Sequence, residues 1–150
     1  MNKTIAQQLN ITDFPFTVED KDGNRVYWED SDGWWEKREF DDANDLVYSE
    51  DSDGVFEKHR YDDYGNQIYF ERSTGYWEKR KFDAKGNEVY FEDSIGYWEK
   101  RKLDAKGNEV YHEDSDGTII DKRPKSKAID KVAKARKLLK QAEKELKEAK

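Results

Sequence analysis

The sequence has no cysteine, two prolines, one methionine and no long hydrophobic run. Without cysteine, a disulfide framework, a thiolate metal site and a cysteine nucleophile are excluded. No run of about 18 apolar residues occurs, so the sequence predicts no membrane-spanning helix. The N-terminus lacks the apolar core of a signal peptide. These absences predict a cytoplasmic protein, of a bacterial cell or encoded by a phage, that is not secreted by a signal peptide and has no membrane partner.

Leu, Ile, Val and Phe are also scarce. Only 27 of the 150 residues are Leu, Ile, Val or Phe, whereas 42% are charged, a balance that is typical of disordered chains. The 5 Trp, 9 Tyr and 7 Phe argue against disorder, because disordered chains are poor in aromatic residues. The length favours one folded domain.

The net charge of -7 hides an asymmetry along the chain. Residues 125–150 hold ten basic and four acidic side chains, whereas residues 1–124 hold 18 basic and 31 acidic ones, which gives net charges of +6 and -13. An acidic body repels a polyphosphate, so direct nucleic-acid binding is not expected. A basic protein partner, or association of the tail with the body, is compatible with this pattern.

A 21-residue repeat is the strongest signal in the sequence. Several residue types recur at this step, and such self-similarity indicates one supersecondary unit stacked on copies of itself. The recurring positions are Gly33, Gly54, Gly75, Gly96 and Gly117; Gly23, Asn44, Gly65, Gly86 and Gly107; Tyr27, Tyr48, Tyr69, Tyr90 and Tyr111; Glu29, Glu50, Glu71, Glu92 and Glu113; and Asp20, Asp41, Asp62, Asp83 and Asp104.

Each unit reads as two short strands joined by tight turns. Aromatic and β-branched residues fill segments such as 89–92 and 97–103, and Asp, Ser, Asn and Gly separate them. One Gly or Asn per turn supplies the positive φ of a type I turn with a G1 bulge. We therefore predict a mainly β fold, an antiparallel β-hairpin repeat array of ten or eleven strands that forms a twisted single-layer meander sheet, followed by a C-terminal α-helix.

The alternation of side chains within a strand predicts the composition of the two faces. Val26 and Trp28 are expected on one face, and Tyr27 and Glu29 on the other. Neither face is purely apolar, because charged columns accompany the aromatic ones. A two-layer sandwich requires one dry face, so this composition favours a single exposed sheet whose ends need protection against edge pairing.

The predicted organisation has three parts. Residues 1–13 form an N-terminal cap segment with a short helix that begins after Thr4 as N-cap. Residues 14–124 form the five-unit repeat domain. Residues 125–150 form a basic amphipathic helix with Ser126 as N-cap, which docks on its own sheet or, as an alternative, pairs with a second copy in a homo-oligomer.

No constellation in the sequence predicts catalysis or a metal site. The Asp20–Gly23 string resembles the start of a calcium-binding EF-hand loop. An EF-hand has a glutamate at position twelve and a helix on each side, whereas here position twelve from Asp20 is Ser31 and the flanking segments are predicted strands. A repeated glutamate column on an open sheet gives no isolated carboxylate pair in a cleft. His59 and His112 each occupy a structural column of the repeat. We expect no enzyme activity, no cofactor and no metal.

The spacing of the repeat resembles that of YD repeats, also called RHS repeats. The matching pattern, an aromatic residue followed by Asp-x-x-Gly-Asn and then by a second glycine ten residues after the first, occurs at 61–66 with Gly75 and at 82–87 with Gly96. The resemblance covers about residues 18–124 and implies a wall of β-hairpins. Members are mostly large toxin shells and adhesion proteins, and the short acidic form here is similar to small bacteriophage and bacterial proteins. Five units are too few to enclose a cargo.

The sequence favours a binding role. The aromatic residues Trp34, Trp35, Tyr76, Trp77, Tyr97 and Trp98 are candidates for exposed binding rows, although the same residues could serve as the core of a thin sheet. A non-catalytic scaffold for protein interaction or self-association is the favoured function. An acidic decoy of a nucleic-acid-binding host protein and a glycan-binding module are the alternatives.

Overall fold

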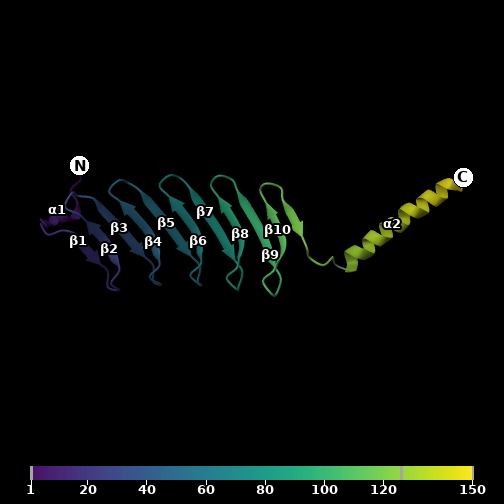
Figure 1. Ribbon diagram of the computed structural model, residues 1–150, viewed down its shortest axis with the longest axis horizontal. Coiled ribbons are helices and arrows are strands. Elements are labelled where there is room, and N and C mark those ends of the chain that lie inside the picture. The colour runs from purple at the N-terminus through teal and green to yellow at the C-terminus, as the bar shows by residue number, and fades with distance from the viewer. Residues whose placement is uncertain (1, 126, 150) are drawn as a thin grey trace. The chain divides into compact units, whose positions relative to one another are not determined.

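The protein folds into one open antiparallel sheet, preceded and followed by a helix. The structure, a computed structural model, describes residues 2–125 and 127–149. In these residues the sheet has 11 strands that lie side by side in chain order (Figure 1). They are β1 (Phe16–Glu19), β2 (Arg25–Glu29), β3 (Trp35–Phe40), β4 (Leu46–Asp51), β5 (Phe56–Tyr61), β6 (Gln67–Arg72), β7 (Trp77–Phe82), β8 (Glu88–Asp93), β9 (Trp98–Leu103), β10 (Glu109–Asp114) and β11 (Ile119–Asp121). The predicted hairpin meander is confirmed.

The two helices occupy the sequence positions at which the 21-residue repeat would place further strands. One unit before β2 are residues 4–8, and helix α1 spans Ile5–Leu9 with Thr4 as its N-cap residue. One unit after β10 are residues 130–135, which lie inside helix α2 (Lys127–Glu148). Helices cannot extend a ladder, so the array of strands begins at β1 and ends at β11.

The turns have the geometry that their residues predict. In the first turn, the Asp20 N–H donates to the Asn24 carbonyl (2.9 Å) and the Gly23 N–H donates to the Asp20 carbonyl (3.2 Å). Gly23 has φ 85°, and Asn44, which replaces glycine in the next unit, has φ 65°. This left-handed conformation favours Gly and then Asn, because a Cβ atom is strained there.

Each unit also contains a β-bulge that the alternation rule does not predict. In the pairing of β4 with β3, Glu39 faces Tyr48 and Phe40 faces Leu46, so Val47 is an extra residue. The equivalent residue of the first unit, Val26, lines the same groove as Tyr27. The expectation that Val26 shares a face with Trp28 is therefore wrong, because the extra residue reverses the alternation at that point.

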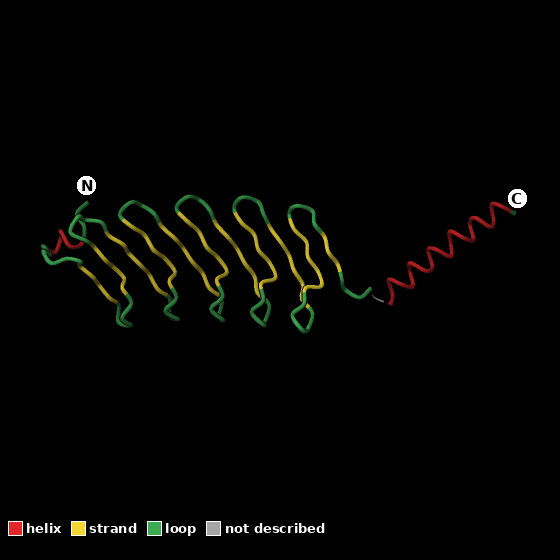
Figure 2. The backbone as a smooth tube through the Cα atoms, in the orientation of Figure 1, coloured by secondary structure: helices red, strands yellow, loops and turns green. Residues whose placement is uncertain are grey.

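The register shifts steadily across the sheet. Tyr27 faces Lys37, and Lys37 faces Glu50, whereas the residue equivalent to Tyr27 in the next unit is Tyr48. Each unit is therefore displaced by 2 residues along the strand direction. The strands consequently run obliquely to the row that they form (Figure 2).

The sheet is one layer thick, and it has almost no dry interior. Among the described residues, the buried apolar side chains are Ala6 and Tyr27, and the buried charged ones are Glu29, Asp93 and Glu99. Most strand residues are half-buried by their neighbours on the same face. Cross-strand pairs of aromatic rings with the stems of long charged side chains therefore replace a conventional core.

The chain divides into two compact units, residues 1–120 and 121–150. In the second unit, the described apolar side chains Val132, Leu138, Leu139 and Leu146 are exposed. Ser126 and the side chain of Ile129 lie outside the described residues, and docking of α2 stays a prediction. No helix in the described ranges is long and apolar enough to cross a membrane.

Candidate functional site

One face of the sheet, here called the tyrosine face, carries three columns that follow from the 21-residue repeat. They are the tyrosines Tyr27, Tyr48, Tyr69, Tyr90 and Tyr111, the glutamates Glu29, Glu50, Glu71, Glu92 and Glu113, and the rings of Trp35, Phe56, Trp77 and Trp98. The repeated lysines of β5, β7 and β9 lie over these last rings: the Lys79 Nζ atom is 4.5 Å from the Trp77 ring centroid, and Lys100 is 4.9 Å from that of Trp98. Such cation–π contacts contribute about 0.5–1 kcal/mol each at exposed sites.

The opposite face, here called the arginine face, is held together by ion pairs. Arg38 contacts Glu36 at 2.9 Å, and Arg80 lies between Glu78 (2.5 Å) and Glu88 (3.3 Å). These groups are part-buried, and they alternate with the phenylalanine rings of β6 and β8. The result is a lattice of paired charges and aromatic rings.

The six predicted binding residues do not form one surface. Trp35, Trp77 and Trp98 face Glu29, Glu71 and Glu92 across the strands, and so they lie on the tyrosine face. Trp34, Tyr76 and Tyr97 lie on the arginine face, where the Trp34 ring contacts Trp28 and the two tyrosine hydroxyls donate to Glu78 and Glu99. A ligand on either face therefore meets only three of the six, and their role in binding stays a prediction.

The first unit of the tyrosine face binds the N-terminus of helix α1. The Glu29 carboxylate, 1% exposed, accepts hydrogen bonds from the Thr4 hydroxyl, from the Ala6 N–H (3.1 Å) and from the Tyr27 hydroxyl (2.8 Å). Thr4 also caps the helix, since its hydroxyl accepts from the Gln7 N–H (3.3 Å). A carboxylate at the end of a helix that exposes N–H groups is favourable for both the hydrogen bonds and the helix dipole.

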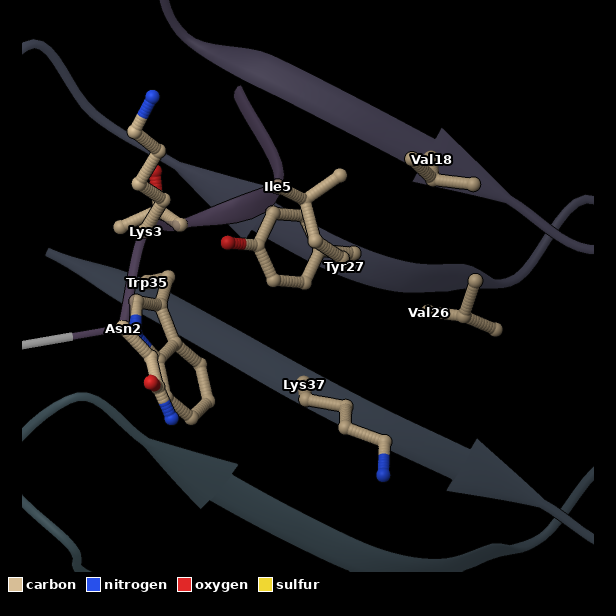
Figure 3. A pocket seen from close by; sticks show the side chains of 9 residues that line it. Asn2, Lys3, Ile5, Val18, Val26, Tyr27, Trp35 and Lys37 are labelled. Atoms are coloured by element: carbon tan, nitrogen blue, oxygen red, sulfur yellow. The ribbon is translucent and has the colours of Figure 1, made fainter. Parts of the chain in front are cut away.

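An apolar groove of about 550 Å³ opens beside this contact (Figure 3). Ile5 of α1, Val18 of β1 and the rings of Tyr27 and Trp35 line it, with Lys37 at its edge. Burial, followed by the hydrogen bond to Glu29, raises the pKa of Tyr27 to about 12. The Tyr27 hydroxyl therefore remains protonated, and remains a donor to Glu29, throughout the physiological pH range.

The turn aspartates form a second periodic feature. In four of the five turns that begin at the repeated aspartate, the Asn side chain four residues later donates to the Asp carboxylate, for example from Asn66 to Asp62 at 3.0 Å. Backbone N–H groups of the turn donate to the same carboxylates. These bonds favour the charged form, and they lower the pKa of Asp20, Asp62, Asp83 and Asp104 below 3.8.

This pattern predicts a specific acid sensitivity. A carboxyl with a lower pKa in the folded state stabilises the fold above its unfolded pKa, and that contribution is lost as the pH falls through the folded value. We expect the urea midpoint of the wild type to fall below about pH 4. The variant Asn66→Ala/Asn87→Ala/Asn108→Ala should lose less stability than the wild type over the same acid range. Equal acid losses in the two proteins would contradict this account of the turns.

The two histidines have structural surroundings. His59 packs against the Phe70 ring, its Nδ1 lies 2.6 Å from the Gln67 side-chain amide, and burial lowers its pKa. His112 lies 3.1 Å from Asp114. Within the described residues, no group of three or more His, Asp or Glu side chains could hold a metal ion.

The serines play a part that the sequence did not reveal. Serine in a turn commonly hydrogen-bonds to the backbone of that same turn. Instead the Ser94 hydroxyl accepts from the Trp77 N–H of the preceding unit (3.2 Å), and Ser115 does the same for Trp98 (3.3 Å). The Ser94 N–H in turn donates to the Trp77 carbonyl (2.9 Å). The serine column therefore extends the pairing between successive units, which only the register could show.

Comparisons with known proteins support the fold. No protein-family model matches the chain, and no curated protein does. Among solved structures, a Photorhabdus luminescens Tc holotoxin pore aligns with a TM-score of 0.51 at 12% identity over 77% of this chain and 6% of that chain. The crystal structure of TcdB2-TccC3-TEV gives the same TM-score, identity and coverage. This likeness supports a YD/RHS-like fold, and the chain spans only a small part of those proteins.

Proposed function

We propose that the chain is a non-catalytic repeat scaffold that binds a protein through its exposed sheet, and that it is a short, acidic relative of YD/RHS repeat proteins. The observation that carries this proposal is the single-layer sheet itself. Each face of this sheet presents a regular lattice of aromatic and charged groups at a fixed step. Such a lattice suits an extended contact with another protein. The proposal includes no enzyme activity, no cofactor and a cytoplasmic location.

The tyrosine face is the better candidate for this contact. The Lys58 side chain is 48% exposed although it pairs with Glu71 at 3.6 Å, whereas Arg80, which pairs with Glu78 on the arginine face, is 28% exposed. The arginine face uses its charges internally, in ion pairs such as that between Arg101 and Glu99 (2.5 Å). Glycan binding is less well supported, because sugars stack on open aromatic faces whereas Lys79 and Lys100 already lie over Trp77 and Trp98.

The acidic decoy is the second candidate, favoured by the net charge of -13 in residues 1–124. Both proposals can be tested by capture of proteins from a bacterial lysate on immobilised full-length chain. A partner held by aromatic contacts should remain at about 1 M NaCl, where the Debye length is about 3 Å. A decoy's basic partner should be released well below that concentration.

A pair of matched variants makes the capture experiment specific. Trp77→Leu/Trp98→Leu removes two rings from the tyrosine face, and we expect it to reduce the salt-resistant capture at least about tenfold. Tyr76→Leu/Tyr97→Leu removes two rings from the arginine face, and it should leave the capture unchanged. Capture that only low salt supports, or that both variants reduce equally, would contradict a scaffold role for this face.

A further inference from the structure

The Tyr27–Glu29 pair that binds α1 has four copies further along the sheet. In each, the tyrosine hydroxyl donates to the glutamate two residues later: the distances are 3.1 Å for Tyr48, 3.0 Å for Tyr69, 3.2 Å for Tyr90 and 2.9 Å for Tyr111. We call these four pairs rungs 2 to 5, and the Tyr27–Glu29 pair rung 1. The glutamates of rungs 2 to 5 are half-buried, and the tyrosine hydroxyl orients each carboxylate; in rung 3 Glu71 also pairs with Lys58 at 3.6 Å.

What differs between the rungs is the residue that faces the tyrosine. Val18 faces Tyr27 in rung 1, and there Ile5 of α1 lines the groove together with both residues (Figure 3). The facing residues of rungs 3, 4 and 5 are Arg60, Lys81 and Lys102, and each places its cation over the tyrosine ring, at 4.5 to 5.9 Å from the centroid. In rung 1 the residue that faces the tyrosine is apolar, and so is the helix residue Ile5 beside it. In rungs 3 to 5 the residue at the same facing position is a cation.

A hollow also accompanies rungs 3 and 4. A cavity of about 680 Å³ lies beside rungs 3 and 4, lined by Ile68, Tyr69, Lys81, Tyr90 and Glu92 among others. Ile68 occupies the same repeat position as Val26 in the first groove. The tyrosine face thus repeats both the carboxylate acceptor and the adjacent hollow of the α1 site.

From this we propose that rungs 3 to 5 bind the N-termini of short helices of a partner protein. Each helix would begin with a Thr or Ser N-cap, whose hydroxyl and following N–H groups donate to the rung glutamate as Thr4 and Ala6 do to Glu29. Its first helical residue, which corresponds to Ile5 of α1, would be acidic. It would pair with Arg60, Lys81 or Lys102, which occupy the position that Val18 has in rung 1. An acidic residue in the first turn also suits the helix dipole.

The spacing of the rungs fits this ligand. Successive rungs are two strands apart, about 10 Å across the sheet, and are displaced by two residues, about 7 Å along it. The resulting separation of about 12 Å matches the diameter of a helix with its side chains, about 10–12 Å. Neighbouring rungs can therefore each hold one helix, and the proposed partner is a helical bundle or a protein with several such helix ends on one surface.

This inference rests on the proposed scaffold function, and it can be tested with the intact chain, in which α1 already occupies rung 1. The probe is an acetylated peptide of residues 2–12 that carries Ile5→Glu, and binding is followed by the amide chemical shifts of the ¹⁵N-labelled protein. Short helices are marginal in water, so we expect a Kd on the order of 1 mM. Shift changes should saturate at rungs 3 to 5.

Three comparisons make the result decisive. The same peptide with Thr4→Ala should bind at least about tenfold more weakly, because it lacks the hydroxyl donor. In the protein, Glu92→Gln should weaken binding at rung 4 by a similar factor, and Glu143→Gln, an equal charge change on α2, should not. Absence of shifts at about 5 mM peptide, or equal shifts with the Thr4→Ala peptide, would overturn the inference. If salt-resistant protein capture persists in that case, the proposed scaffold function stands without it.

Discussion

Proline in place of Lys79 is expected to split the unfolding of the sheet into two separate transitions. Lys79 lies in the middle of β7 and pairs with Tyr69 on one side and Glu92 on the other. Proline removes the N–H donor and fixes φ near −65°, which a central strand does not tolerate. Among the described residues each strand pairs only with its two neighbours, so the backbone ladder between the two halves of the array runs through β7.

We expect a loss of about 2–4 kcal/mol, from the unpaired backbone group and the distorted strand. Urea unfolding resolves the halves when far-UV circular dichroism follows the whole sheet and tryptophan fluorescence follows its N-terminal half. In a Trp77→Phe/Trp98→Phe background, only Trp28, Trp34 and Trp35 contribute to that fluorescence. The matched control is Lys79→Ala in the same background, which also removes the lysine side chain but keeps the N–H. A single transition in the proline variant, at the midpoint of the alanine variant, would contradict a sheet held by nearest-neighbour pairing alone.

Glutamine in place of Glu29 is expected to release helix α1 from the sheet. The carboxylate accepts from three donors, Thr4, Ala6 and Tyr27, whereas a glutamine side chain presents an NH₂ group to at least one of them. Hydrogen bonds to a buried charge contribute about 1.5–3 kcal/mol. We therefore expect the free energy that holds α1 in place to fall by about 2–3 kcal/mol.

Hydrogen exchange of the Ala6 amide measures this loss directly, because Ala6 is buried and its N–H donates to Glu29. Its protection should fall by about two orders of magnitude. Glu92→Gln is the matched control. The same change in a rung without a helix should lower the free energy of unfolding by less than about 1 kcal/mol. Unchanged protection of Ala6 in Glu29→Gln would show that the carboxylate does not hold the helix.

The architecture was predictable because the turns, the aromatic columns and the charged columns all repeat with the same period of 21 residues. The same step sets the turn residues, the aromatic columns and the charges, so Asn44 could be assigned its positive φ from its place in the glycine column. The bulge at Val26 and Val47 was not predictable, because an inserted residue leaves the period intact and changes only which face a side chain occupies. Strict alternation of side chains, applied through the bulge, assigns Val26 to the face opposite Tyr27, which is wrong.

The candidate site was only partly predictable. Aromatic and charged columns could be found from the repeat, but their distribution over two faces separates Trp34 from Trp35 and Tyr76 from Trp77. The contact between Glu29 and α1 joins residues 23 to 25 positions apart through side chains, and no periodic signal marks it. In hindsight, Val18 is a clue, since it places an apolar residue where later units have Glu or a cation.

The pairing register between units tests the central claim most directly. If the chain is a staggered array of hairpins, NMR contacts between the Hα protons of facing strands should connect β3 with β4 in a register where Lys37 faces Glu50. The same displacement should recur at Lys58 with Glu71 and at Lys79 with Glu92. Contacts that place Lys37 opposite Tyr48, or an absence of contacts between successive hairpins, would contradict the fold on which every proposal here depends.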